Sequence, residues 1–265
     1  MIKGFFLIFS LFIPFTVYSA EYYVSTGGDD NNPGTFASPW ETFQKAAGTA
    51  QAGDIVYFRG GVYYEGGLAP VNSGSAGSPI VFKAYHDEIP VIDGSYYGGS
   101  NGFAVYGKSY FKLEGFEIRN YMGGHCIWLW DCHHFELKNL TVHHSYFGIG
   151  CSYGSHDFVL TNVEIHHFTL YGFDATGNGS DCYNGEFVNC SAHSCNDDTQ
   201  NVDGFALGHG SQSNFSFTNC TVYDVYDGFD MSANDVTIDR CMGYDCVNGA
   251  LKLWADNITV KNSLF

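Results

Sequence analysis

A glycine-centred phrase that returns six times constrains the fold of this chain more than any other feature. The copies lack helical periodicity and are separated by 24, 24, 32, 24 and 21 residues. In a repeat of this length, each unit is one supersecondary coil that buries its apolar face only by stacking on neighbouring coils. The sequence therefore predicts an all-β solenoid. The phrases read GHCI, GIGC, GFDA, GFAL, GFDM and GALK, and they begin at Gly124, Gly148, Gly172, Gly204, Gly228 and Gly249.

Each predicted coil also carries a turn residue between two short alternating segments. From Phe111 onward, one template recurs as FKLEGFEI, FELKNLTV, FVLTNVEI, GEFVNCSA, FSFTNCTV, VTIDRCMG and ITVKNSLF. Asparagine, the usual residue at the turn, tolerates left-handed backbone and bonds to nearby main chain. We therefore expect a stack of equivalent turns. The turn position is held by Gly115, Asn139, Asn162, Asn189, Asn219, Arg240 and Asn262.

The first twenty residues differ from the rest of the chain. They contain one cation, Lys3, then an apolar run, and they end in small residues at Ala20. This pattern is typical of a signal peptide, here cleaved after Ala20. A membrane anchor is the alternative, but the run is shorter than the roughly 20 apolar residues that a membrane span needs. Residues 21–265 are then one β-helix domain.

Both ends of this domain carry information about capping. One helix is predicted within residues 40–51 (WETFQKAAGTAQ), where apolar residues at helical spacing follow a capping-type start. Such a helix would cover the N-terminal end of the solenoid, whose unpaired strand edge otherwise invites association. At the other end, NITVKNSLF begins another coil and reaches Phe265 without the polar cap that a solenoid requires. We therefore expect the domain to be truncated at its C-terminus.

The acidic composition limits the partners of the chain. The net formal charge is −17, and only 11 of 265 residues are Lys or Arg. This balance argues against a nucleic acid or an anionic membrane as a partner held by charge attraction. An anionic substrate stays open, because carboxylates that bind Ca²⁺ can hold a polyanion through the cation. We expect an exported, soluble monomer once the signal peptide is removed.

The nine cysteines all lie between Cys126 and Cys246. In an exported protein, such a number first suggests disulfides. Three of them, Cys190, Cys220 and Cys241, occupy the same step of three coils, where earlier coils have leucine or valine. We interpret this step as a core position that cysteine fills as a small apolar residue. A disulfide between stacked coils stays open as the alternative, because strand spacing is near the range that a disulfide tolerates.

Histidines also fall into a column of the repeat. His143, His166 and His193 stand four residues after the turn position of successive coils. Stacked histidines could bind a transition metal. The alternative is a stacked polar face, which we favour because no carboxylate or cysteine completes a ligand set.

Aspartates gather in the last coils when the coils are aligned on glycine. Alternation sends Phe229 and Met231 to one face of the strand and Asp230 to the other. Asp203 and Asp227 then stack on adjacent coils with Asp230 close by, and three such charges repel unless a cation neutralises them. The cluster predicts a Ca²⁺ site, and the alternative is a solvated acidic face. The aligned columns are Gly123, Phe147, Tyr171, Asp203, Asp227 and Asn248 before the glycine, and Cys126, Gly150, Asp174, Ala206 and Asp230 after it.

A lysine completes the candidate site. The phrase NGALKLW departs from the glycine register by one residue, which places Lys252 outward in the step next to Asp230. A cation bound nearby disfavours the charged form of an amine, so the pKa of Lys252 should fall beside Ca²⁺. The lysine could then act as a general base. The alternative is an ordinary solvent-exposed lysine.

These residues resemble a known family. The order NVDGFA, then YDGFD, then an outward lysine in NGALKLW, each about one coil apart, is similar to the polysaccharide lyase family 9 pectate lyases. The segments YYVSTGGDDNNPGT and PWETFQKAAGTAQAGDIVYFRGGVY near the beginning also resemble such β-helix enzymes. One position departs from the family pattern, because Tyr226 stands where an Asp-Asp pair would have its first member. Losing one carboxylate should weaken the cation site.

The resemblance implies a specific activity. It implies a right-handed parallel β-helix that holds Ca²⁺ through Asp203, Asp227 and Asp230. It further implies cleavage of polygalacturonate by β-elimination, with Lys252 as the base. Arginine often holds a uronate carboxylate, and Arg240 is the nearest arginine by coil position. We expect an acidic polysaccharide as the substrate.

Two other classes of function stay open. The inverting polygalacturonase type of hydrolase also uses clustered aspartates on this fold, and the chain has NVDG at 201–204 and GHG at 208–210, although both fall in one coil. A non-catalytic β-helix that binds glycans is the other alternative, favoured by Tyr226 and by the rule that a fold does not imply activity. A lyase for another uronan, such as alginate, is a nearer variant.

Overall fold

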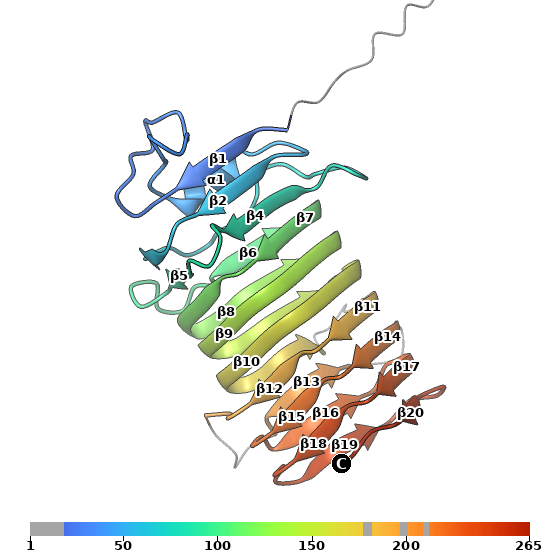
Figure 1. Cartoon of the computed structure of the whole chain (residues 1–265). Coiled ribbons are helices and arrows are strands. Elements are labelled where there is room, and N and C mark those ends of the chain that lie inside the picture. Colours follow the sequence, from blue (N-terminus) through green and yellow to red (C-terminus); the bar gives the residue numbers. More distant parts are fainter. Residues whose placement is uncertain (1–18, 177–181, 197–200, 209–211) are drawn as a thin grey trace, which may run out of the picture.

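The described part of the chain is a right-handed parallel β-helix (Figure 1). The computed structural model describes residues 19–176, 182–196, 201–208 and 212–265. The predicted all-β solenoid is therefore confirmed. The predicted signal peptide falls almost wholly on residues 1–18, which lie outside the described residues. Among the residues described, no helix is long and apolar enough to cross a membrane.

Twenty strands and one helix make up the described coils. In chain order they are β1 (Glu21–Val24), α1 (Phe43–Thr49), β2 (Ile55–Phe58), β3 (Gly61–Tyr63), β4 (Ile80–Ala84), β5 (Pro90–Asp93), β6 (Phe103–Tyr106), β7 (Ser109–Glu114), β8 (Glu117–Trp130), β9 (His133–Ser152), β10 (His156–Ala175), β11 (Tyr183–Val188), β12 (Ser191–His193), β13 (Asp203–Leu207), β14 (Ser213–Thr218), β15 (Thr221–Tyr223), β16 (Asp227–Met231), β17 (Asn234–Asp239), β18 (Met242–Tyr244), β19 (Gly249–Leu253) and β20 (Thr259–Lys261).

Parallel pairing between successive coils arranges these strands in three rows. The first row runs β1, β2, β4, β7, β9, β10, β11, β14, β17 and β20, and the second runs β3, β5, β8, β9, β10, β12, β15 and β18. The third row runs β6, β8, β9, β10, β13, β16 and β19. Strands β8, β9 and β10 belong to more than one row because each continues through a corner of its coil. Residues far apart in sequence thus become neighbours along a row.

The predicted helix is present but begins later than the sequence suggested. It spans Phe43–Thr49, and the side chain of Thr42 caps it by accepting a hydrogen bond from the Lys45 N–H. Trp40 stays outside the helix because it forms a parallel bridge with Val24. The helix lies at the N-terminal end of the solenoid (Figure 1). The Phe43 ring is fully buried and stacks on Phe58. The helix therefore closes that end of the core, as expected of a cap.

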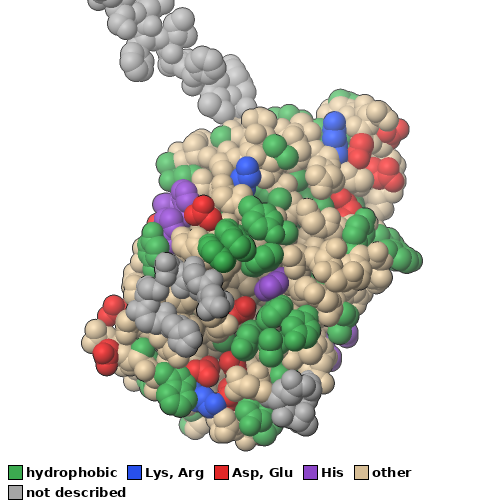
Figure 2. All heavy atoms as spheres, turned by 180° about the vertical axis from the view of Figure 1, so that it is seen from behind, with side chains coloured by type: hydrophobic (Ala, Val, Ile, Leu, Met, Phe, Trp, Pro, Cys, Tyr) green, Lys and Arg blue, Asp and Glu red, His purple; other side chains and the backbone are tan. Residues whose placement is uncertain are grey.

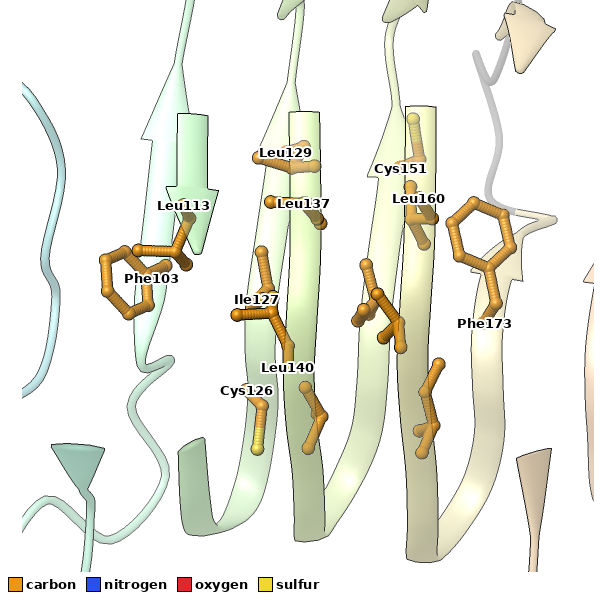
Figure 3. Packing of buried hydrophobic residues seen from close by; sticks show 14 of the residues in the cluster. Phe103, Leu113, Cys126, Ile127, Leu129, Leu137, Leu140, Cys151, Leu160 and Phe173 are labelled. Carbon is orange, nitrogen blue, oxygen red and sulfur yellow. The ribbon is translucent and has the colours of Figure 1, made fainter. Parts of the chain in front are cut away.

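Stacked columns of apolar side chains fill the interior (Figure 3). Burial of this apolar surface is the main favourable contribution to folding. Cys190, Cys220 and Cys241 are free thiols, buried in one of these columns. The core interpretation of these three cysteines is therefore confirmed in the structure.

The stack of equivalent turns is present. Asn139, Asn162, Asn189 and Asn219 all have left-handed backbone, with φ between 52° and 55°. Each asparagine side chain after the first donates to the amide oxygen of the preceding one, at 2.9, 3.1 and 3.2 Å. Arg240 has the same backbone conformation and donates to Asn219 at 3.0 Å. The ladder ties successive corners together along the solenoid.

The repeated glycines mark a place where adjacent coils touch through their backbones. A Cβ on Gly148 would lie 2.4 Å from the carbonyl oxygen of Gly172, and one on Gly172 would lie 2.5 Å from that of Gly204. A Cβ on Gly228 would lie 2.3 Å from the carbonyl oxygen of Ala250. No side chain fits at these distances, so the phrase recurs because of close packing between coils.

The register corrects the glycine alignment at its two ends. At the N-terminal end, a bulge between Tyr121 and His125 places His125, rather than Gly123, in the column of Phe147. At the C-terminal end, Gly249 rather than Asn248 lies beside Asp227. Backbone pairing and the bulge therefore set the register between coils, and the position of the glycine in the sequence phrase does not.

The histidine column is a stack of rings. His143, His166 and His193 lie face to face with centroids 4.6 and 5.3 Å apart, and Tyr223 and Tyr244 continue the stack. His193 also contacts Glu164. The rings form the stacked face that we favoured over a metal site, but the expectation that no carboxylate stands beside the column was wrong, because Glu117 also lies 3.3 Å from His143.

Candidate functional site

The third row brings four of the five predicted site residues together. Asp203 begins β13, and Asp227 begins β16 and lies directly beside it. Asp230, also on β16, lies directly beside Lys252 of β19. Phe229, between the two aspartates of β16, is fully buried in the core. Alternation along β16 therefore sends Asp230 to the outer face, as predicted.

The three aspartates form an acidic cluster. One oxygen from each of Asp203, Asp227 and Asp230 lies within 4.8 Å of the other two, and no other group of His, Cys, Asp and Glu in the described ranges meets this condition. Asp203 is 3% exposed and Asp227 is fully buried. The Oδ1 atom of Asp203 is also buried and has no hydrogen-bond partner within the described structure. An unpartnered buried carboxylate oxygen in an all-oxygen cluster fits a hard divalent cation such as Ca²⁺.

Two side chains of the last coil hold Asp227 in place. The Nζ atom of Lys252 lies 2.5 Å from Asp227 Oδ2, with the lysine side chain 21% exposed. The Nδ2 atom of Asn248 donates to Asp227 Oδ1 at 3.1 Å. Both oxygens of the most buried carboxylate in the cluster are therefore partnered.

The electrostatics of the cluster reflect its excess of negative charge. Burial, together with the charges of Asp230 and Asp227, raises the pKa of Asp203 to about 7, against an opposing effect of Lys252. Burial also raises the pKa of Asp230. A single lysine therefore does not balance the charge of three carboxylates that lie this close together.

The lysine itself is held in its charged form in this arrangement. Partial burial lowers the pKa of Lys252, but the hydrogen bond that it donates to Asp227 and the charges of the cluster outweigh burial and raise the pKa above its ordinary value. The sequence predicts a depressed pKa of Lys252 only when a cation is bound beside it. Such a cation would bind the carboxylates that stabilise the ammonium group in the present arrangement.

Tyr226 does not join the cluster. Its side chain is partly buried and packs against the hydrophobic core. A tyrosine that packs on the core thus stands where the family pattern has a fourth carboxylate. Three aspartates remain as candidate ligands of the cation.

Arg240 has partners elsewhere in the fold. It lies in the turn between β17 and β18, where it contacts Asp239 at 3.2 Å and donates to Asn219. These strands belong to the first and second rows, whereas the acidic cluster lies on the third row. A role of Arg240 in substrate binding stays a prediction.

Sequence reasoning passed over two polar residues near the cluster. Asn248, which bonds Asp227, stood in the aligned column but carried no charge to single it out. Asp174 lies in the same column as Asp230, two strands away, with Ala206 between them. Burial raises the pKa of Asp174, and Thr176 donates to its carboxylate. Both residues stand in the columns aligned on glycine. Only their hydrogen bonds in the structure distinguish them from ordinary polar surface residues.

Comparison with known proteins assigns the chain to a family. A family model described as a Pel9A-like, right-handed β-helix region matches residues 22–261. The chain belongs to this Pel9A-like β-helix family. The match includes the cap helix and all five predicted site residues, and it confirms the resemblance found in the sequence.

Individual relatives agree with this assignment. The pectate lyase PEL9 of Emericella nidulans is 26% identical over 218 residues, which cover 77% of this chain and 47% of the relative. The chain thus spans about half the length of this curated relative. Among solved structures, pectate lyase Pel9A matches with a TM-score of 0.71 and 22% identity over 88% of this chain and 67% of that one. A rhamnogalacturonan lyase matches with a TM-score of 0.68 and 19% identity, covering 86% and 69%. At these identities the structural matches show the fold.

Proposed function

We propose that the chain is a Ca²⁺-dependent polysaccharide lyase that cleaves an acidic polysaccharide, polygalacturonate in the first instance, by β-elimination. The observation that carries this proposal is the placement of Lys252 against a buried three-carboxylate cluster with an unpartnered oxygen. The names of the family relatives, a pectate lyase among them, support the same class of reaction.

The cluster would supply the ligands for the cation. Asp203, Asp227 and Asp230 would hold it, and Tyr226 leaves any further coordination to water or substrate. When bound there, Ca²⁺ would neutralise the uronate carboxylate and make the proton at C5 of the sugar more acidic. Asn248 would keep Asp227 oriented while Lys252 is released from its ion pair.

Lys252 would act as the general base. Its neutral amine would take the proton from C5, and the electrons of that C–H bond would form the C4–C5 double bond while the bond from C4 to the glycosidic oxygen breaks. The departing oxygen would take up a proton from solvent and become a hydroxyl of the second product. One product is then an unsaturated uronate, and no water is added across the bond.

The spacing of the carboxylates argues against the hydrolase alternative. Inverting glycoside hydrolysis needs acid and base carboxylates about 6.5 to 9.5 Å apart. The three aspartates approach one another within 4.8 Å, and the GHG segment at 208–210 lies mostly outside the described residues. The proposal also includes export and a monomeric state, for which the signal-like residues 1–20 and the acidic surface are the support.

The deciding experiment is incubation with polygalacturonate, with and without a chelator, followed by the ultraviolet absorbance of unsaturated uronates. We expect absorbance to rise only with Ca²⁺ and to be lost in Lys252→Met, whereas Lys261→Met, an exposed lysine on the first row, keeps full activity. New reducing ends without this ultraviolet absorbance would show that the chain is a hydrolase and not a lyase. Binding without any cleavage would support the glycan-binding alternative.

A further inference from the structure

The two columns that form the acidic cluster continue along the third row as aromatic residues. In the column of Asp203 and Asp227, the preceding coils place Tyr171 and Phe147, followed by His125. In the column of Asp230 and Lys252, the β8 strand places Trp128. The aromatic residues are therefore fixed on the same face as the cluster by strand register.

These side chains form one continuous group, which we call the aromatic surface. The Trp130 and Tyr153 rings are stacked at 3.6 Å, and Trp128 lies 5.3 Å from Trp130. The Trp128 indole also donates to Ser152 at 3.3 Å, which fixes its orientation. The aromatic surface consists of Tyr106, His125, Trp128, Trp130, Phe147 and Tyr153.

The aromatic surface is accessible from outside. Tyr106 is 50% exposed and Tyr153 is 44% exposed, and the two tryptophans are half-buried. On the face in Figure 2, apolar side chains gather in the middle of the solenoid, with acidic side chains beside them toward the C-terminal end. From β8 to β13 there are three strand spacings of about 4.8 Å, so Trp128 lies roughly 14 Å from the level of Asp203. A chain of a few sugar residues lying along the row would contact both regions.

Local packing sets the orientation of the His125 ring relative to Trp128. Gly150 follows Trp128 in the same column, and a Cβ there would lie 2.5 Å from the His125 ring. The glycine therefore leaves room for His125 to lie parallel to Trp128, with centroids 5.4 Å apart. Exposed aromatic rings suit the apolar C–H faces of pyranose sugars, and an exposed apolar patch of this kind marks a binding surface.

The charge of this region differs from that of the cluster. Lys252 is the one Lys or Arg among the described residues that pair within the third row, because Arg119 of β8 and Lys138 of β9 pair in the other two rows. Burial lowers the pKa of His125 to about 4, so its ring is neutral at ordinary pH. A uronate carboxylate placed over the aromatic surface would thus find no cationic partner and would lose hydration.

We propose that the aromatic surface binds uncharged sugar rings of the polysaccharide whose uronate lies at the acidic cluster. The inference rests on the proposed function for the path of the polysaccharide along the third row. The stacking of sugar rings on the aromatic surface itself needs neither a cation nor cleavage. Two sources supply the same chemistry, namely a neutral sugar and a methyl-esterified uronate. The enzyme would then prefer a polysaccharide with a local mixture of charged and uncharged residues over a fully charged one.

The test uses the intact protein in chelator and follows tryptophan fluorescence and calorimetry. The probes are oligogalacturonates of one length, fully methyl-esterified or fully de-esterified, and a neutral galacto-oligosaccharide of the same length. We expect the ester, the neutral oligosaccharide or both to bind, which identifies the source, and the charged form to bind about tenfold more weakly. Equal or tighter binding of the charged form, or no binding of either uncharged probe, would overturn the proposal.

Substitutions locate the binding. Trp128→Ala should weaken binding of the uncharged probe by about tenfold. Tyr106→Ala and Tyr153→Ala remove exposed rings and so give a second measurement that does not depend on how Trp128→Ala folds. Tyr96→Ala, at an exposed tyrosine that contacts Tyr64 instead, is the matched control. Unchanged affinity in the folded variants of the aromatic surface would refute the assignment, even if lyase activity were found.

Discussion

Replacing Lys252 by methionine should destabilise the protein far more without Ca²⁺ than with it. Asp227 is fully buried, and its Oδ2 atom is 2.5 Å from Lys252 Nζ. Removing one partner of a buried ion pair costs about 3–5 kcal/mol, because a buried charge is left uncompensated. The lysine side chain is 21% exposed, and protonation of Asp203 can relieve part of the repulsion. We therefore expect a loss of about 2 kcal/mol in chelator.

A bound divalent cation should remove most of this loss. Ca²⁺ supplies the positive charge that the methionine variant lacks, so its destabilisation at saturating Ca²⁺ should fall below about 0.6 kcal/mol. The difference of about 1.4 kcal/mol must appear in the binding equilibrium, because the four states form a closed thermodynamic cycle. The variant should thus bind Ca²⁺ about tenfold more tightly than the unsubstituted chain.

Thermal melts in chelator and in Ca²⁺, together with calorimetric Ca²⁺ titrations, measure both sides of the cycle. A loss of about 2 kcal/mol corresponds to a Tm lower by roughly 4–8 °C. Lys261→Met is the matched control, since Lys261 Nζ is exposed and 4.0 Å from Asp239, and it should change neither quantity. Equal destabilisation in the two conditions, or weaker Ca²⁺ binding by Lys252→Met, would refute the cluster as a cation site that Lys252 opposes.

Three further predictions concern the scaffold. Gly172→Ala should lower the Tm by several degrees, because its Cβ would lie 2.5 Å from the Gly204 carbonyl oxygen; Gly48→Ala, with open space around it in α1, should not. Asn189→Ala should cost about 1–2 kcal/mol in denaturant melts, because it removes two ladder bonds and strains a φ of 55°, and an unchanged midpoint would contradict the ladder. His125→Phe should abolish a pH-dependent loss of stability. The folded pKa of about 4 is below the unfolded value, so this contribution is full above pH 6.5 and falls by about 3 kcal/mol toward pH 4. Melts of wild type and variant should therefore move apart as the pH falls from 6.5 toward 4, because only the wild type loses this contribution.

The parts of the site that were predictable from the sequence depend on local pattern. Asp203 and Asp227 occur in nearly identical phrases on adjacent coils, and alternation within four residues sends Asp230 outward. The asparagine turns were predictable for the same reason, because left-handed backbone is a property of the single residue. Periodicity and turn chemistry thus determined the coils and the three acidic residues.

What escaped the sequence depends on register and on contacts across coils. The bulge in β8 shifts the alignment, so that Trp128 rather than Cys126 lies in the column of Lys252, and the aromatic surface could not be recognised from the glycine phrase. The ion pair of Lys252 likewise depends on a side-chain geometry that no repeat encodes. Such features arise from packing between coils, which a single sequence does not specify.

The pairing of Tyr171 with Asp203, and of Asp203 with Asp227, has a consequence for how such a protein can diversify. These pairs are separated by 32 and 24 residues in sequence, yet they occupy consecutive steps of one column. Insertions between paired strands therefore leave the spacing of the reactive groups untouched. Segments outside the strands are free to be lengthened or exchanged to change which sugars are selected, while the reaction centre keeps its dimensions, and this makes the scaffold a favourable starting point for engineering specificity.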